Sequence, residues 1–153
     1  MKKLNVQLEE LANKISFQET VNMNVSNSTI GWHIEHSLLV INLIIEQLKI
    51  SEPKNYKWCF KLSREVVFVL KKIPRGKAKS PKAVAPKAFD EKTLREHLEI
   101  TKINIQDLES IISDKYFNHP FFGNLKVNRT KKFLRIHTKH HLEIINDIAK
   151  NTI

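Results

Sequence analysis

Four segments of this chain carry apolar residues at intervals of three or four positions, the spacing that lines one face of an α-helix. They cover Leu4 to Lys14, Thr29 to Leu48, Asp90 to Ile112 and Asn128 to Ile148. In the second segment Val40, Leu43 and Ile44 widen the apolar stripe, which predicts a helix covered on more than one side. Only three glycines occur, too few for a turn-rich β architecture. We therefore predict an all-α fold.

The remaining segments complete the predicted architecture. A shorter helix is expected over Trp58 to Lys72, and a Lys- and Pro-rich connection over residues 71–87 is expected to be irregular. Asp90 and Asn128 are of the types that cap helices at their N-termini. No strand of useful length and no internal repeat is evident. The sequence thus predicts an antiparallel four-helix bundle with an additional short helix and a long basic loop, as one domain over residues 1–153.

The net charge of +10 is concentrated in one segment, and without its seven basic residues the rest of the chain carries about +3. The seven are Lys71, Lys72, Arg75, Lys77, Lys79, Lys82 and Lys87. Such a segment suits nucleic acid or another polyanion, but it has no interleaved aromatic residues for base stacking. Polyanion binding is therefore the alternative function, and a solvated connection is the simpler interpretation of the segment.

Other features indicate a soluble, cytoplasmic protein without a membrane partner. The N-terminal Met-Lys-Lys is not followed by the apolar core of a signal peptide. The longest apolar stretch, Ser37 to Ile45, is too short to span a bilayer. The single cysteine, Cys59, excludes an internal disulfide and fits a reducing compartment. Its neighbours Trp58 and Phe60 predict that its thiol is buried and unreactive.

Two of the seven histidines share one face of the last predicted helix. His137 and His141 are four residues apart, on the stripe that carries Phe133 and Ile144. Both therefore point toward the core, where an imidazole without a partner is costly. Imidazole nitrogens one helical turn apart can bind a single metal ion. Thr138 stands where the His-Glu-x-x-His protease motif has its glutamate, so that hydrolytic mechanism is not supported.

A third ligand would have to come from another helix. His33 and His36 lie three residues apart in the second predicted helix and share one side of it. Their spacing does not select between them. The spacing also leaves open whether His140 faces the ion, solvent or a partner subunit.

Several segments resemble a known superfamily. Thr29 to His36, which reads Thr-Ile-Gly-Trp-His-Ile-Glu-His, resembles the start of the metal-binding helix in the DinB/YfiT-like metalloenzyme superfamily. The turn His119-Pro-Phe-Phe-Gly and the helical segment His137-Thr-Lys-His-His141 resemble a branch of that superfamily described as a domain of unknown function. Pro74 to Lys77, followed by Ser-Pro-Lys, is also similar to that branch. The resemblance spans residues 25–150.

This resemblance implies a four-helix bundle that holds one divalent ion, nickel or zinc, on His36, His137 and His141. It sets aside His33 and His140, which do not match ligand positions of the family. Related members include thiol-dependent transferases and isomerases that use bacillithiol or mycothiol. The expected function is that of a metal-dependent enzyme acting on a small substrate by thiol transfer or hydrolysis. A non-catalytic metal-binding bundle is a further alternative, and a homodimer is compatible with a small bundle.

No general base follows from the sequence. Glu35 and Glu143 lie close to predicted ligands along the chain but are turned away from them on the helix, and Asp147 lies near His140 in projection. A solvated helix face is the simplest expectation for all three acids. The aromatic residues that can line a pocket over the ion, or simply pack in the core, are Trp32, Trp58, Phe121 and Phe122.

Overall fold

The structure is a computed structural model that describes residues 2–76 and 80–150. These residues are mostly helical, as predicted, with a small two-stranded sheet. The elements are α1 (Lys2–Ala12), α2 (Ile30–Ile50), α3 (Leu62–Leu70), α4 (Glu91–Ser110), β1 (Tyr116–His119), β2 (Gly123–Lys126) and α5 (Val127–Lys150). Short 3₁₀ turns lie at Ile15–Phe17, Pro53–Asn55 and Lys82–Val84. Within the described ranges, no helix combines the length and the apolar character needed to cross a membrane.

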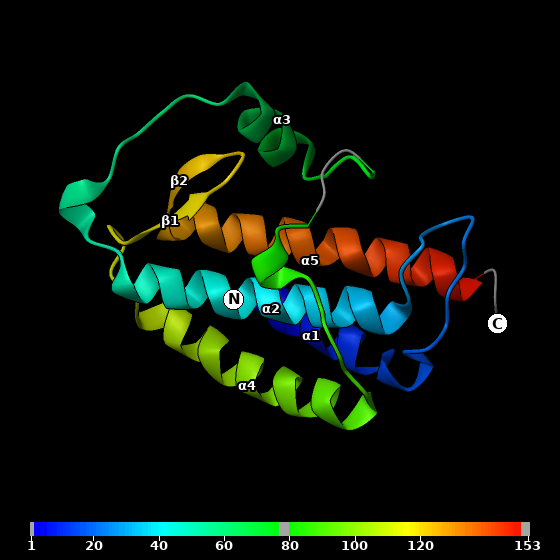
Figure 1. The fold of residues 1–153 in the computed structure, drawn as a ribbon. Coiled ribbons are helices and arrows are strands. Elements are labelled where there is room, and N and C mark those ends of the chain that lie inside the picture. Colours follow the sequence, from blue (N-terminus) through cyan, green and yellow to red (C-terminus); the bar gives the residue numbers. More distant parts are fainter. Residues whose placement is uncertain (1, 77–79, 151–153) are drawn as a thin grey trace.

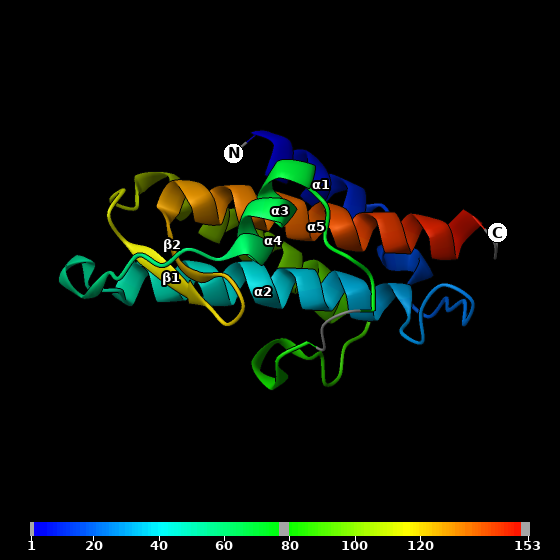
Figure 2. The ribbon, with the colours of Figure 1, turned by 90° about the horizontal axis from the view of Figure 1, so that it is seen from above.

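Helices α1, α2, α4 and α5 lie side by side around a common apolar core (Figure 1). Helix α2 contacts both α4 and α5, which accounts for its wide apolar surface. The predicted helical spacing in α1 is confirmed, because Leu4, Leu8 and Leu11 are fully buried. Each such side chain contributes about 1.5–3 kcal/mol through burial. The short helix α3 lies against α5, outside this layer of long helices (Figure 2).

The direction of the helices differs from the predicted antiparallel order. The colours of Figure 1 show that α1 and α5 run one way and that α2 and α4 run the other way. Neighbours α2 and α5 are therefore antiparallel, whereas two other neighbouring pairs, α2 with α4 and α1 with α5, are parallel. The reason for the first of these is the long connection between α2 and α4, which is described over residues 51–76 and 80–90 and carries α3. An α-helix of this size is about 30 Å long, so only a long connection allows the parallel arrangement.

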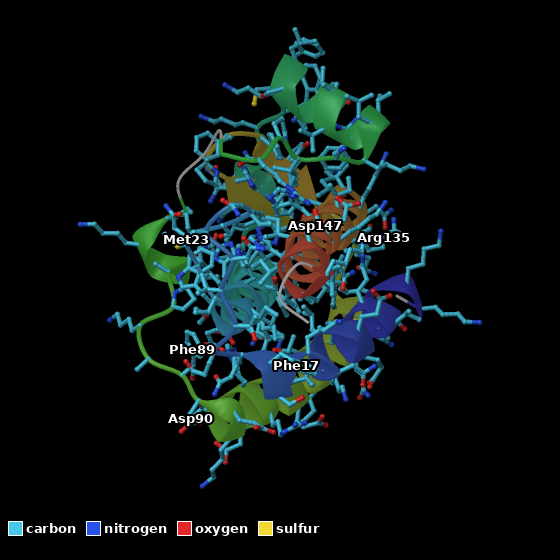
Figure 3. The ribbon with its side chains drawn as sticks, turned by 90° about the vertical axis from the view of Figure 1, so that its right-hand side faces the viewer. Phe17, Met23, Phe89, Asp90, Arg135 and Asp147 are labelled. Atoms are coloured by element: carbon cyan, nitrogen blue, oxygen red, sulfur yellow. The ribbon has the colours of Figure 1, made fainter. Side chains whose placement is uncertain are left out.

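The start of α2 is fixed by a cap and by close packing. The Oγ1 atom of Thr29 accepts a hydrogen bond from the Trp32 backbone N–H at 3.1 Å. At Gly31 a Cβ atom would lie 2.5 Å from a ring carbon of Phe89, so no larger residue fits. Figure 3, viewed along the helices, shows Phe89 and Phe17 at this end of the molecule. The cap and the glycine together set the register of the histidines that follow.

Two other helix starts test the predicted caps. Asp90 is the N-cap of α4, as expected, and forms a capping box in which its carboxylate accepts from the Thr93 N–H at 2.7 Å. Asn128 is not a cap, because α5 begins at Val127 and Asn128 lies exposed in the first turn. Strand β2 ends at Lys126 and leads directly into α5, so no separate capping residue is present between them.

A β-hairpin is present where no strand was predicted. Strands β1 and β2 pair in antiparallel register, with Phe117 opposite Leu125 and His119 opposite Gly123. Phe117 and Leu125 are buried against the core, but four-residue strands are too short to show an alternating pattern in the sequence. Gly123 has a φ angle of 69°, and a Cβ atom there would lie 2.6 Å from the sulfur of Cys59.

The segment before α3 also differs from the prediction. Helix α3 begins only at Leu62, so Trp58 to Lys61 lies outside it. The side chains of Trp58 and Phe60 are 65% and 61% exposed, and Cys59 is partly exposed. The prediction of a buried thiol is therefore wrong, because apolar neighbours in an extended segment do not ensure burial.

Candidate metal centre

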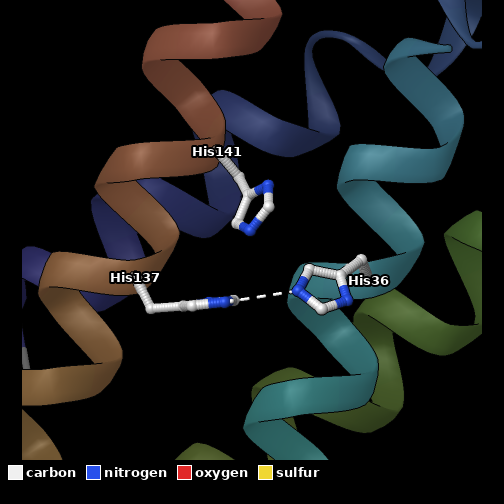
Figure 4. A group of neighbouring side chains, drawn as sticks. All are labelled: His36, His137 and His141. Atoms are coloured by element: carbon white, nitrogen blue, oxygen red, sulfur yellow. Dashed lines mark hydrogen bonds between the residues drawn. The ribbon is translucent and has the colours of Figure 1, made fainter. Parts of the chain in front are cut away.

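Three histidines from two helices converge between α2 and α5 (Figure 4). His36 projects from α2, and His137 and His141 project from successive turns of α5. One nitrogen atom from each ring lies within 4.8 Å of the others. The Nε2 atoms of His36 and His137 are 3.3 Å apart. The three residues predicted as metal ligands are therefore close enough to hold one ion, and we call them the histidine triad.

His36 is held by the connection between α3 and α4. Its Nδ1–H donates to the backbone carbonyl of Val84 at 2.8 Å, and the Ser80 hydroxyl lies 3.2 Å from the same nitrogen. The indole of Trp32 stacks on its ring at a centroid distance of 5.0 Å. A neutral imidazole that donates through Nδ1 keeps a lone pair on Nε2, the atom that faces His137. A carbonyl partner of this kind typically orients a metal-binding histidine.

His141 is oriented by a second histidine. Its Nδ1 atom lies 3.0 Å from Nδ1 of His33, and Nε2 of His33 lies 3.0 Å from the Ser26 hydroxyl. If Nε2 of His141 carries the lone pair for a metal, its Nδ1–H donates to His33, and His33 donates in turn to Ser26. Figure 4 shows one ring nitrogen of His141 pointing between the other two rings of the triad. The residue that spacing could not separate from His36 thus contacts the triad as a hydrogen-bond partner.

His137 is the incomplete member of the triad. Its Nδ1 atom is buried and has no hydrogen-bond partner among the described residues. Burial lowers the pKa of His36, and it lowers the pKa values of His137 and His141 well below the usual 6.5. All three rings are therefore neutral near pH 7, the form that binds metals.

The donor set and its spacing fit a divalent ion. Nitrogen ligands suit zinc, nickel, copper and iron. With Zn–N bonds of about 2.0–2.1 Å, two nitrogens of a tetrahedral site lie about 3.3 Å apart. The measured separation of 3.3 Å between the Nε2 atoms of His36 and His137 matches this value. Without a cation, two lone pairs would face each other unless one ring carried its proton there.

The other histidines are engaged outside the triad. His140 is partly exposed and forms a hydrogen bond with the Ile73 backbone, although its ring lies 5.1 Å from that of His141. His119 stacks on Phe122 at 4.4 Å, and its Nδ1 accepts backbone N–H groups of the hairpin turn. His97 pairs with the carboxylate of Glu35 at 2.9 Å.

The candidate acids do not join the triad. Glu35 is not on a solvated face as predicted, because its side chain is only 14% exposed and faces His97. Asp147 is 39% exposed, as expected for a solvated face, and pairs with Arg75 at 2.8 Å. Glu143 lies at the surface, 3.5 Å from the Nζ atom of Lys139.

The four aromatic residues that were predicted to line a pocket over the ion or to pack in the core also lie in different places. Trp32 is the one that contacts the triad, through its stacking on His36. Phe122 is buried against His119, whereas Trp58 and Phe121 are 65% and 54% exposed. The basic connection also contributes, because Ser80 and Val84 belong to it. Its residues Lys77 and Lys79 lie outside the described residues.

Comparisons with protein-family models, with curated proteins and with solved structures gave no match. The resemblance to DinB-like proteins consequently rests on the quoted motifs. The case for a metal site rests on the geometry of the triad.

Proposed function

We propose that this protein is a metal-dependent enzyme of the DinB-like type, built as a four-helix bundle, that acts on a small substrate by thiol transfer or hydrolysis. Its divalent ion, zinc or nickel, is held by His36, His137 and His141. The observation that carries this proposal is the convergence of three neutral imidazoles within 4.8 Å, with two Nε2 atoms spaced as ligands of one ion. A homodimer stays a prediction.

Three protein ligands favour a catalytic over a structural ion, because a coordination position is left for water or substrate. When bound, the ion would lower the pKa of a water or thiol ligand, or polarise a carbonyl. The protein's own residues orient the rings: the Val84 carbonyl holds His36, and His33 holds His141. His36 and His141 are buried, and His137 is partly buried.

The surroundings of the triad favour thiol transfer over protease-like hydrolysis. Thr138, where a general base would stand in a His-Glu-x-x-His motif, is fully buried. No acid among the described residues belongs to the metal-capable group, and Glu35 is engaged by His97. A thiolate needs no general base once its pKa has been lowered by a metal, whereas a water nucleophile usually does.

The proposal is tested with the cobalt-substituted protein. Cobalt(II) bound to three imidazoles and one exchangeable ligand gives a visible spectrum, and a small thiol such as 2-mercaptoethanol should add a sulfur-to-metal absorption band. His140→Ala is the matched control and should give the same band. A cobalt spectrum that no thiol, azide or hydroxide changes would show a closed site, and the non-catalytic alternative would then hold.

Polyanion binding by the basic connection stays a prediction, although some of its residues have local contacts. Arg75 is paired with Asp147, and Ser80 and Val84 face the triad. The segment therefore has a local role beside His36.

A further inference from the structure

A cleft lined by residues with polar groups lies away from the triad, between the segment before α3, the hairpin and the start of α5. It has a volume of about 300 Å³ and is open to solvent on one side. The residues of its wall that matter here are Tyr56, Trp58, Arg64, Asp114, Lys126 and Arg129. Arg129 and His137 are eight residues apart on α5, about 12 Å along the helix axis. The cleft is therefore a site of its own.

Arg64 is the unusual residue of this cleft. Its side chain is only 1% exposed, because it lies on the same face of α3 as the buried Val67 and Phe68. Its Nε donates to Glu65 at 2.8 Å and its Nη1 donates to the Phe122 carbonyl at 3.1 Å. Its Nη2 is buried without an acceptor among the described residues. A buried guanidinium N–H group without an acceptor is costly, so this group is available to an acceptor on a ligand.

The charges around the cleft are also unbalanced. Glu65 accepts from both Arg64 and Arg129, at 2.8 and 2.7 Å, and Lys126 pairs with Asp114 at 2.6 Å. The hydrogen bonds from the two arginines lower the pKa of Glu65, so it stays ionised. Three cations therefore share two carboxylates, and one positive charge remains uncompensated. The unpaired Nη2 atom and this charge both favour an anion.

We propose that this cleft binds a small organic anion whose carboxylate or phosphate accepts a hydrogen bond from Nη2 of Arg64. Arginine is suited to such groups because its N–H donors match the geometry of an oxyanion. The volume of about 300 Å³ lies at the small end of ligand pockets, which suits a small metabolite. Trp58, 65% exposed at the wall, offers an aromatic surface for the rest of the ligand.

The test uses the full-length protein freed of metal with a chelator, so that it does not depend on the triad. Inorganic phosphate and benzoate are titrated at constant ionic strength and followed by calorimetry and tryptophan fluorescence. Saturable binding of either probe is expected. A higher affinity for benzoate identifies a carboxylate ligand, and a higher affinity for phosphate identifies a phosphate ligand. Trp58→Phe should remove the fluorescence change, since the other tryptophan, Trp32, lies beside the triad.

Two variants assign the binding to Arg64 and to the charge of the cleft. Arg64→Lys keeps the charge but loses the Nη2 donor, and it should weaken binding about tenfold. Asp114→Asn removes an acid from the rim and should tighten binding severalfold. Asp107→Asn, an exposed acid of α4 paired with Lys49, is the matched control and should change nothing.

The proposal is overturned if neither probe binds saturably, or if both cleft variants bind like the unmodified protein. Should Arg64→Lys fail to fold, the surface variant Asp114→Asn decides alone, and an unchanged affinity would contradict the proposal.

Discussion

Helix α2 takes part in two clusters of buried or partly buried polar side chains, one shared with α4 and the other shared with α5. In the α4 cluster both ring nitrogens of His97 have a hydrogen-bond partner. His97 donates to Glu35 at 2.9 Å and accepts from Asn42 at 2.7 Å. Asn42 also donates to Thr101 and accepts from Asn104, at 2.8 and 2.9 Å. One neutral tautomer of His97 satisfies the whole network.

The α5 cluster is built differently. Its three histidines face one another, no carboxylate joins them, and Nδ1 of His137 has no partner among the described residues. A histidine that is largely shielded from solvent, such as His97, is therefore not by itself a sign of metal binding. When a carboxylate and an amide bind the two ring nitrogens of a histidine, its hydrogen-bonding groups are satisfied. When several imidazoles face one another with unpaired nitrogen lone pairs, a metal cation can satisfy them. Four predictions test this difference.

The largest effect is expected from removal of a ligand. His137→Ala or His141→Ala should weaken zinc binding by more than about 100-fold, because losing a ligand costs more than losing an outer partner. Calorimetric titration with zinc measures the change. His140→Ala should bind zinc as the unmodified protein does. Equal zinc affinity in all of these variants would remove the distinction between the two clusters.

A smaller loss of affinity is expected at the outer partner of His141. His33→Ala removes the group that lies 3.0 Å from Nδ1 of His141, and zinc affinity should fall about 10–100-fold. The same titration tests it, with Ser26→Ala expected to have a weaker effect in the same direction. A variant that loses zinc completely would instead place His33 among the ligands.

A substitution in the α4 cluster should lower the stability of the protein and leave its metal binding unchanged. His97→Ala leaves Glu35 and Asn42 without their partner, and it should lower the free energy of unfolding by about 1–3 kcal/mol. Urea unfolding of the metal-free protein measures this. Zinc affinity should stay unchanged, and a parallel loss of zinc would show that the two clusters are not independent.

The last prediction concerns the pH dependence of the metal-free protein. Burial lowers the pKa values of His33 and His119 from 6.5 to about 4, and those of His137 and His141 also fall. The unfolded chain then binds more protons than the folded chain between pH 6.5 and about 4. Stability should be full above pH 6.5 and decline as the pH falls through this range. Urea unfolding at pH 7.5 and pH 5 checks this, and equal stability at both would contradict it.

The α5 half of the triad was predictable from the sequence, because helical spacing puts His137 and His141 on the core side of one helix. The choice of His36 came from the resemblance. Helical spacing could not choose between His33 and His36, because both lie on one side of α2. In the structure His36 is a member of the triad, and His33 contacts another member, His141.

Other parts were not predictable for physical reasons. The Val84 carbonyl that holds His36 is a backbone group and leaves no side-chain signal. The parallel direction of α2 and α4 depends on the path of the long connection, which helical periodicity does not specify. Arg64 did leave a signal that was missed: a charged residue on the same helical face as Val67 and Phe68.

The most direct test of the account is the position of the metal itself. Crystals of the zinc-loaded protein, measured at the zinc absorption edge, should show one anomalous peak about 2.0–2.1 Å from a nitrogen of each of His36, His137 and His141. A peak at His140, His119 or His97, or no peak at full zinc loading, would contradict the central claim that these three residues form the metal centre.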